Sequence, residues 1–124
     1  MTPASRRAIP VFEVRESTIH GRGVFALRSI RKGERIAEYT GERVSHARAD
    51  RRYEDRPEHD NHTFLFIVDR RTVIDAAVGG NEARYINHAC DPNCETLVED
   101  RRVFIEALRD IEPDEELSYD YQIG

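Results

Sequence analysis

The sequence predicts a single, mainly β domain built from short strands, with one or two small helices. Short apolar runs recur along the 124 residues, and glycine turns interrupt them. Two charged turns, at residues 69–71 and 99–102, are each flanked by such runs, which is typical of hairpins. The length fits one domain, since domains contain about 100–200 residues, and the chain shows no internal repeat or heptad pattern.

The strands expected in the first part of the chain lie on either side of glycine turns. Residues 11–15 alternate weakly between apolar and polar, and residues 23–27 (GVFAL) form an apolar run that opens on glycine. Residues 31–34 (RKGE) form a glycine turn that leads into a strand at residues 35–39 (RIAEY).

One short polar helix is expected over residues 45–54. That stretch contains neither Gly nor Pro, and Arg48 and Arg51 lie about one turn apart. Ser45 is a favourable N-cap residue for such a helix. The apolar run at residues 63–68 (TFLFIV) is rich in aromatic and β-branched residues, which predicts a buried strand.

The second half is expected to hold the two hairpins and a terminal strand. Residues 72–74 follow the first charged turn, and residues 95–98 and 103–108 flank the second. A final strand is expected within residues 116–121 (ELSYDY). Between the hairpins, residues 79–94 differ from their surroundings, because two glycines, three Asn and one Pro are mixed with aromatic residues and His.

Composition limits the partners that the chain is expected to bind. The net charge is −5 and 35% of the residues are charged. This acidic balance argues against binding to nucleic-acid phosphates and favours a basic, lysine-rich protein or peptide. No apolar run approaches the roughly 20 residues of a membrane span, and residues 1–10 lack the apolar core of a secretory signal. We therefore expect no direct contact with nucleic acid or membrane.

His88, Cys90 and Cys94 form an H-x-C-x3-C pattern that resembles part of a zinc site. A structural zinc site usually needs four ligands, commonly as two close pairs, and the chain has no further cysteine. A cysteine nucleophile paired with His88 is a second interpretation, but the sequence supplies no third group to orient the pair. In a chain without an export signal we expect reduced, buried thiols and no metal.

Two further segments carry candidate functional residues. Residues 17–26 (STIHGRGVFA) place two glycines around Arg22. Such glycines let a backbone approach a ligand and expose amides to a carboxylate or phosphate, although an ordinary tight turn explains them equally. Tyr119 and Tyr121 project to the same face of a strand, so both hydroxyls can enter one cavity, or both rings can pack against a strand edge.

Taken together and in order, these segments resemble the SET-domain protein lysine methyltransferases. The resemblance extends from about residue 11 to residue 121, and its matching stretches are STIHGRGVFA, GERIAEYTGE, TFLFIVDRRTVIDAAVGGNEARYINHACDPNC and DEELSYDY. The most specific part is NEARYINHACDPNC at residues 81–94, combined with the terminal ELSYDY. The resemblance implies a SET-type β-clip of small curved sheets over residues 11–124, after an N-terminal extension at 1–10. It also implies a C-terminal pseudoknot, in which the Asn-His segment passes beneath a loop of the C-terminal part.

The same resemblance implies methyl transfer from S-adenosylmethionine (SAM) to the ε-amine of a lysine in a histone or another lysine-rich protein. SAM and the target lysine would enter from opposite faces and meet in a narrow channel. Tyr121 would be the catalytic tyrosine, Tyr119 would tune the number of methyl groups, and Tyr39 would line both sites. The residues expected at the cofactor are His20, Gly21, Arg22, Gly23, Tyr39, Arg84, Tyr85, Asn87 and His88.

Details of the match refine these expectations. A hydroxyl at Tyr119, where other family members carry Phe, would crowd the lysine amine, so we expect mono- or dimethylation. Ala89 stands where the family usually has serine, which removes a hydrogen bond worth about 1 kcal/mol. The sequence ends at Gly124 without the cysteine-rich post-SET tail of many relatives, so Cys90 is expected to be metal-free.

Without that tail, the lysine channel would be completed by a second copy, by the substrate, or not at all. A homodimer that buries the C-terminal edge is therefore one expectation. The alternative to an enzyme is a catalytically weak SET-like module that binds SAM or a peptide. The location would be nuclear in a eukaryote and cytoplasmic in a bacterium.

Overall fold

The structure, a computed structural model, describes residues 10–54 and 64–121 and divides into two compact units. The first unit holds the chain up to Ile36 together with residues 85–95 and the chain from Glu106 onward, and the second unit holds the remainder. Of the extension expected at residues 1–10, only Pro10 lies within the described residues. The strands β3 (Arg35–Tyr39), β9 (Arg102–Ala107) and β8 (Cys94–Glu99) form a three-stranded sheet in that order.

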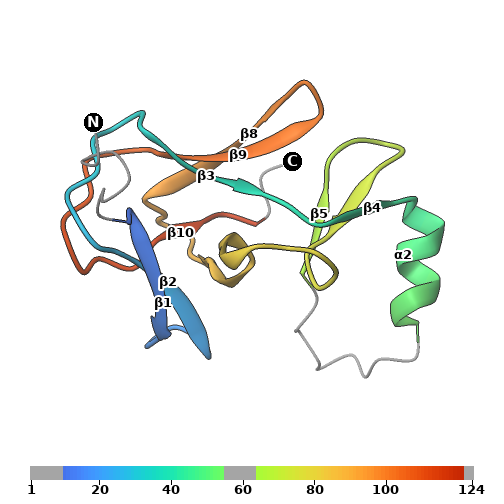
Figure 1. The fold of residues 1–124 in the computed structure, drawn as a ribbon, viewed down its shortest axis with the longest axis horizontal. Helices are drawn as coiled ribbons and strands as arrows, with labels where there is room; N and C mark the ends of the chain where they lie inside the picture. The colour runs from blue at the N-terminus through green and yellow to red at the C-terminus, as the bar shows by residue number, and fades with distance from the viewer. Residues whose placement is uncertain (1–9, 55–63, 122–124) are drawn as a thin grey trace, which may run out of the picture. The chain divides into compact units, whose positions relative to one another are not determined.

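The first unit contains an antiparallel hairpin of β1 (Phe12–Glu16) and β2 (Arg22–Ala26), drawn in blue in Figure 1. The pairing runs from Phe12 opposite Ala26 to Glu16 opposite Arg22. Val24 and Ala26 are both 0% exposed, because residues two apart on a strand point to the same face. This buried face of β2 anchors the hairpin in the core of the unit.

A parallel pair of very short strands joins the Asn-His segment to the C-terminal segment. In this pair, β7 (Asn87–His88) runs beside β10 (Ser118–Tyr119), with Asn87 opposite Ser118. The preceding residue, Leu117, is fully buried, and its N–H donates to the carbonyl of Val24 at 2.7 Å. The C-terminal segment therefore lies beside both the Asn-His segment and the hairpin, as the predicted fold requires.

The second unit has a small antiparallel sheet and a helix. The sheet order is β4 (Glu42–Val44), β6 (Val73–Asp75) and β5 (Leu65–Ile67), so β6 is central, and all of its residues are buried. The helix α2 (His46–Tyr53) follows β4 directly, as Figure 1 shows in green. Its Ala49 packs in a cluster with Val44, Val73 and Leu65.

The structure confirms most of the expected elements. The expected helix is α2, and its N-cap is Ser45, whose Oγ accepts a hydrogen bond from the Arg48 N–H at 3.1 Å. The strand at residues 35–39 and both hairpins are also present. At the second hairpin turn, Asp100 and Arg101 have φ angles of 52° and 64°, which are typical of a type I′ turn without glycine.

The expectation of a buried strand at residues 63–68 is wrong in its burial. Residue 63 lies outside the described residues. Within residues 64–68 the strand covers Leu65–Ile67, and Ile67 is 65% exposed. The physical reason is that β5 lies at the edge of its sheet, while the central position belongs to β6.

Three short elements have no clear signal in the sequence. They are β4, β7 and a 3-10 helix, η1 (Glu82–Tyr85). Elements of two to four residues are too short to show a period, and their pairing depends on partners far along the chain. Over residues 10–54 and 64–121, the structure contains no helix that is both long enough and apolar enough to cross a membrane.

Candidate active site

The hairpin loop, residues 17–21, is organised by Ser17. The Ser17 N–H donates to the Gly21 carbonyl at 2.7 Å. The Ser17 Oγ accepts hydrogen bonds from the N–H groups of Ile19 at 2.9 Å and His20 at 3.3 Å. Gly21 has a φ of +47°, a left-handed conformation that glycine adopts at little cost. Part of the glycine pattern is thus explained by the turn itself.

A carboxylate from the C-terminal segment supports this loop. Glu116 accepts hydrogen bonds from the Ser17 hydroxyl at 2.8 Å and from the Asn87 side-chain amide at 3.0 Å. A Cβ atom on Gly23 would lie 2.2 Å from Glu116 Oε2. Gly23 is therefore needed for the close approach of this carboxylate, so the second glycine makes room for the protein's own side chain.

Asn87 ties both ends of the loop together. Its Nδ2 lies 3.0 Å from the His20 carbonyl and 3.0 Å from the Arg22 carbonyl, in addition to its contact with Glu116. An Asn side-chain amide has two N–H protons to donate, and the two carbonyls and the carboxylate all lie within hydrogen-bond distance of its nitrogen. In the structure Asn87 holds the loop in place, and a direct bond from its amide to SAM stays a prediction.

An open pocket adjoins the loop. It has a volume of about 530 Å³ and is lined by Glu16, Ser17, Gly21 and Arg22, within the range of about 300–1,000 Å³ for small-ligand sites. The Arg22 guanidinium lies 5.8 Å from the centre of the Tyr85 ring, a cation–π contact that positions its charge. One cation beside a glycine-containing backbone fits the carboxylate end of a ligand such as SAM.

The two C-terminal tyrosines pack against each other and against His88. The Tyr119 and Tyr121 ring centres are 4.8 Å apart, and the His88 and Tyr121 ring centres are 5.2 Å apart. Tyr121 is 53% exposed as a residue, but its hydroxyl points inward and donates to the Ile86 carbonyl. Burial of this group raises the pKa of Tyr121 to about 12. The phenol is therefore protonated near neutral pH and cannot serve as a general base there.

His88 connects Tyr121 to Cys90. Its Nδ1 accepts a hydrogen bond from the Tyr121 N–H at 3.1 Å, so the neutral ring carries its proton on Nε2. That Nε2 lies 3.6 Å from Cys90 Sγ. In that tautomer Nε2 is a donor and cannot accept the proton of the Cys90 thiol, so this arrangement does not support a cysteine nucleophile.

The expectation of two buried thiols is correct for Cys94 and wrong for Cys90. Cys94 is the buried first residue of β8, and burial raises the pKa of its thiol to about 12. Cys90 is exposed because it lies in a turn after β7. Among the described residues, no group of three or more His, Cys, Asp or Glu side chains is arranged to hold a metal ion.

Tyr39 and Arg84 belong to the second unit and make contacts within it. Tyr39 is 4% exposed, and its hydroxyl donates to the Phe64 carbonyl at 2.8 Å. Arg84 Nη1 lies 3.4 Å from the carbonyls of Ala76 and Gly80. The first unit brings together the other expected site residues, so the roles of Tyr39 and Arg84 stay predictions.

Sequence reasoning missed two supporting residues, Ser17 and Glu116. A serine directly before a turn is typical of a side chain that bonds to nearby backbone N–H groups, which is a usable signal for Ser17. Glu116 has no local signal, because its partners lie far away in the chain. Glu116 can be recognised only once the fold is known, because its carboxylate occupies the space that Gly23 leaves open.

Comparison with known proteins decides the family. Residues 21–122 match the family model of the SET domain. The chain belongs to the SET domain family. The resemblance seen in the sequence is thereby confirmed.

This SET domain has curated relatives among much longer proteins. It is 45% identical over 123 residues to "Histone-lysine N-methyltransferase, H3 lysine-4 specific" of Saccharomyces cerevisiae, covering 95% of this chain and 11% of the relative. It is 40% identical over 110 residues to "Histone-lysine N-methyltransferase trithorax" of Drosophila melanogaster, covering 86% of this chain and 3% of the relative. The chain thus spans a small part of the length of each.

Solved structures show the same fold. The crystal structure of the Chaetomium thermophilum polycomb repressive complex 2 matches with a TM-score of 0.83 and 35% identity, over 94% of this chain and 16% of that chain. A structure of ctPRC2 in an autoinhibited conformation, bound to S-adenosylmethionine, matches with the same TM-score, identity and coverage. The SET-type, mainly β fold class is confirmed.

Proposed function

We propose that this SET domain transfers a methyl group from SAM to the ε-amine of a lysine in a protein substrate. Its relatives are named as histone-lysine N-methyltransferases, and a structural neighbour is bound to SAM. The observation in this chain that carries the proposal is the pairing of β7 with β10. That pairing gathers the loop-holding Asn87 and the Tyr119–Tyr121 pair in one compact unit.

When bound, SAM supplies an electrophilic methyl group. The chain's own residues position the reactants. The Arg22 guanidinium and the loop amides suit a ligand carboxylate, and holding the reactants in line supplies much of the acceleration. Because the Tyr121 phenol stays protonated, the substrate lysine must lose its proton without a tyrosine base. Desolvation and nearby positive charge lower the pKa of that amine from its ordinary value of about 10.4.

Tyr119 is proposed to limit the product to mono- or dimethyl-lysine. Its side chain is buried, with 6% of the residue exposed, and it packs against Tyr121. A phenylalanine at this position would remove one oxygen atom from a crowded place. The additional room would accept a bulkier, more methylated amine.

The deciding test compares Tyr121→Phe and Tyr119→Phe, two substitutions that each remove one hydroxyl. Methyl transfer from labelled SAM to histones and lysine-rich peptides is measured, with the product state read by mass spectrometry. We expect Tyr121→Phe to lower turnover by about a hundredfold or more, with nearly unchanged SAM affinity by calorimetry. Tyr119→Phe is expected to keep turnover and to shift the product towards higher methylation.

Other outcomes would contradict specific parts of the proposal. An equal loss of SAM affinity and turnover in Tyr121→Phe would make Tyr121 a structural residue. SAM binding by the wild type without any transfer would favour the binding-module alternative. An unchanged product distribution in Tyr119→Phe would remove the proposed role of Tyr119.

The substrate is proposed to be a basic, lysine-containing protein, with histones as the first candidates because the named relatives are histone methyltransferases. A nuclear location is proposed on the same ground, since those relatives are from eukaryotes. The homodimer stays a prediction, and a mass of one chain in solution at micromolar concentration would contradict it.

A further inference from the structure

The segment that leads into the tyrosines is bonded along both of its edges. On one edge, the Leu117 N–H donates to the carbonyl of Val24 in β2. On the other edge lies a side chain, that of Asn93, which is only 3% exposed. Its Nδ2 donates to the Glu116 carbonyl at 2.9 Å, and its Oδ1 accepts from the Ser118 N–H at 2.9 Å.

This pair of bonds reproduces what a neighbouring strand would make. In an extended chain, the carbonyl of one residue and the N–H two residues later point to the same side. A backbone peptide of an adjacent strand offers one donor and one acceptor to such a pair. The Asn93 carboxamide offers the same two groups to Glu116 and Ser118.

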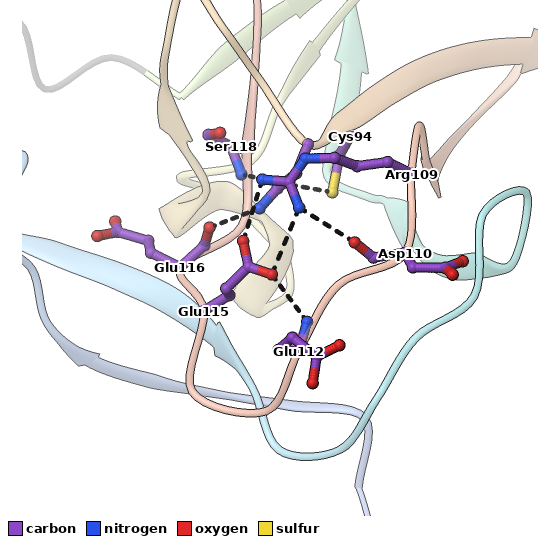
Figure 2. Close-up of polar contacts among 8 residues, drawn as sticks. Cys94, Arg109, Asp110, Glu112, Glu115, Glu116 and Ser118 are labelled. Atoms are coloured by element: carbon purple, nitrogen blue, oxygen red, sulfur yellow. Dashed lines mark hydrogen bonds and ion pairs between the residues drawn. The ribbon is translucent and has the colours of Figure 1, made fainter.

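The surroundings of Asn93 fix its carboxamide. The Cys94 thiol, which is fully buried, donates to Asn93 Oδ1 at 3.4 Å, and the Leu108 N–H donates to the Asn93 carbonyl at 2.8 Å. Figure 2 shows Cys94 near Ser118 and next to the ion pair of Arg109 with Glu115. In that pair, Arg109 Nη2 lies 3.0 Å from Glu115 Oε2. The side chain is therefore held on several sides.

The two bonded residues lead to different parts of the candidate site. Glu116 carries the carboxylate that supports the hairpin loop, and Ser118 begins the strand that holds Tyr119. We infer that Asn93 is a positioning residue for methyl transfer, because its buried carboxamide replaces a neighbouring strand and sets the positions of Tyr119 and the Glu116 carboxylate. The catalytic consequence rests on the proposed function, whereas the bonding itself does not.

The bonding is tested on the full chain by hydrogen exchange, followed by NMR. Asn93→Ala removes the acceptor of the Ser118 N–H, so exchange of that amide is expected to become about tenfold faster. The Leu117 amide, which bonds to Val24, should stay protected. Asn93→Asp keeps an acceptor for Ser118 and loses the donor to Glu116, so it should leave the Ser118 amide protected.

Asn81 provides a matched control in the second unit. Its Nδ2 donates to the Glu38 carbonyl at 2.8 Å, and its Oδ1 accepts from the Ala83 N–H at 3.2 Å. Unlike Asn93, Asn81 is exposed. In the wild type, the side-chain amide protons of Asn93 should therefore exchange more slowly than those of Asn81, a comparison that needs no variant to fold.

The catalytic consequence is tested by turnover per folded molecule. Asn93→Ala and Asn93→Asp are each expected to lower kcat by about tenfold to a hundredfold, because small displacements of reacting groups are costly. Asp50→Asn, an exposed substitution on α2, should leave kcat within about twofold of the wild type. A purely structural role would reduce the folded fraction and leave kcat per folded molecule unchanged.

Three results would each overturn the inference. The first is wild-type turnover by folded Asn93→Ala. The second is fast exchange of the Asn93 side-chain amide in the wild type, and the third is unchanged exchange of the Ser118 amide in Asn93→Ala. If the wild-type chain transfers no methyl group, the proposed function fails, and the exchange data still decide whether Asn93 holds the segment.

Discussion

At the scale of single residues, Gly23 shows how one missing Cβ atom shapes the candidate cofactor site. The atom would meet the Glu116 carboxylate at 2.2 Å. That carboxylate accepts a hydrogen bond from the Ser17 hydroxyl. The Ser17 Oγ in turn accepts a hydrogen bond from the backbone of the hairpin loop and so orders it. The effect of the glycine is therefore indirect, since it admits the side chain that supports the loop.

Gly23→Ala should displace Glu116 and loosen the hairpin loop. We expect SAM affinity, measured by calorimetry, to fall by at least about tenfold, since a charge-assisted hydrogen bond is lost. Gly33→Ala is the control, because Gly33 has a φ of +85° and a Cβ atom added there would meet no other atom within 4 Å. That substitution should cost only backbone strain of about 1–2 kcal/mol in unfolding free energy. Equal SAM affinity in both variants would contradict the role of Gly23.

The family resemblance in the sequence named candidate residues such as Arg22 and Tyr121, whose roles stay predictions, but the sequence showed no sign of residues that act through distant partners. Ser17 and Glu116 are 99 positions apart in the chain, so no local pattern can connect them. The burial of Cys94 and the exposure of Cys90 likewise depend on where each lies relative to a strand, although the two are only four positions apart.

At the scale of elements, a buried carboxylate fastens α2 to the central strand of its sheet. Asp75 is 0% exposed and accepts hydrogen bonds from Arg52 at 2.8 Å, from the Tyr53 hydroxyl at 2.7 Å and from the Ala77 N–H at 3.0 Å. Burial alone would raise the pKa of Asp75, but the hydrogen bonds from these groups outweigh it and lower the pKa. The ionised carboxylate is thus the form that the folded state stabilises.

Asp75→Asn should destabilise the protein by about 2 kcal/mol at pH 7, since it weakens charged hydrogen bonds in a buried place. The pKa of Asp75 is lower in the folded state than the unfolded value of about 3.9. Its stabilising contribution is therefore present above that unfolded value and is lost as pH falls through the folded pKa. The free energy of unfolding is measured with urea at pH 7, 5, 4 and 3. The difference in this free energy between wild type and variant should become smaller at the lowest pH values.

The control for this series is Asp50→Asn, on an exposed position of the same helix. It should change the unfolding free energy by less than about 0.5 kcal/mol. The difference in unfolding free energy between wild type and Asp75→Asn could instead stay constant from pH 7 to pH 3. That result would show that Asp75 is not the titrating group.

Elements with strong local signals were predictable, and those defined by pairing were not. Ser45 begins α2 in the structure as expected, because an N-cap acts within its own helical turn. By contrast, β4 and β7 contain three and two residues, and each is a strand only because another strand lies beside it. The apolar sequence of β5 likewise gave no sign that this strand lies at the edge of its sheet.

At the scale of the whole molecule, charge is the property that bears most directly on the substrate. The chain carries a net charge of −5. An acidic protein attracts basic partners, and this attraction speeds their association. Salt weakens the attraction, because charges more than about 8–10 Å apart are screened at physiological ionic strength.

We expect the KM for a lysine peptide with basic flanking residues to rise severalfold between about 0.05 M and 0.3 M salt. A peptide with the same target lysine and neutral flanks should show a weaker dependence. The comparison uses steady-state methyl transfer at fixed, saturating SAM. Equal salt dependence for both peptides would contradict recognition through the acidic charge.

Fold class followed from the sequence, but the strand pairing did not. The alternating and apolar runs predicted a mainly β chain, and nothing in them specified that Asn87 lies opposite Ser118 in a parallel pair. The resemblance to the SET family implied that the Asn-His segment passes beneath a C-terminal loop, and the structure adds the parallel pairing and its register. Topology of this kind is set by contacts between distant segments, which local preferences do not encode.

The bond between Ser17 and Glu116 also bears on the order in which the molecule is made. The hairpin of β1 and β2 leaves the ribosome well before the C-terminal segment, and its loop receives Glu116 only after 99 further positions have been synthesised. Closing so long a span costs chain entropy, and contacts of this kind form slowly. The loop is therefore fully supported only when the C-terminal segment is in place, and a ligand that binds only the finished loop stabilises molecules that have reached that stage.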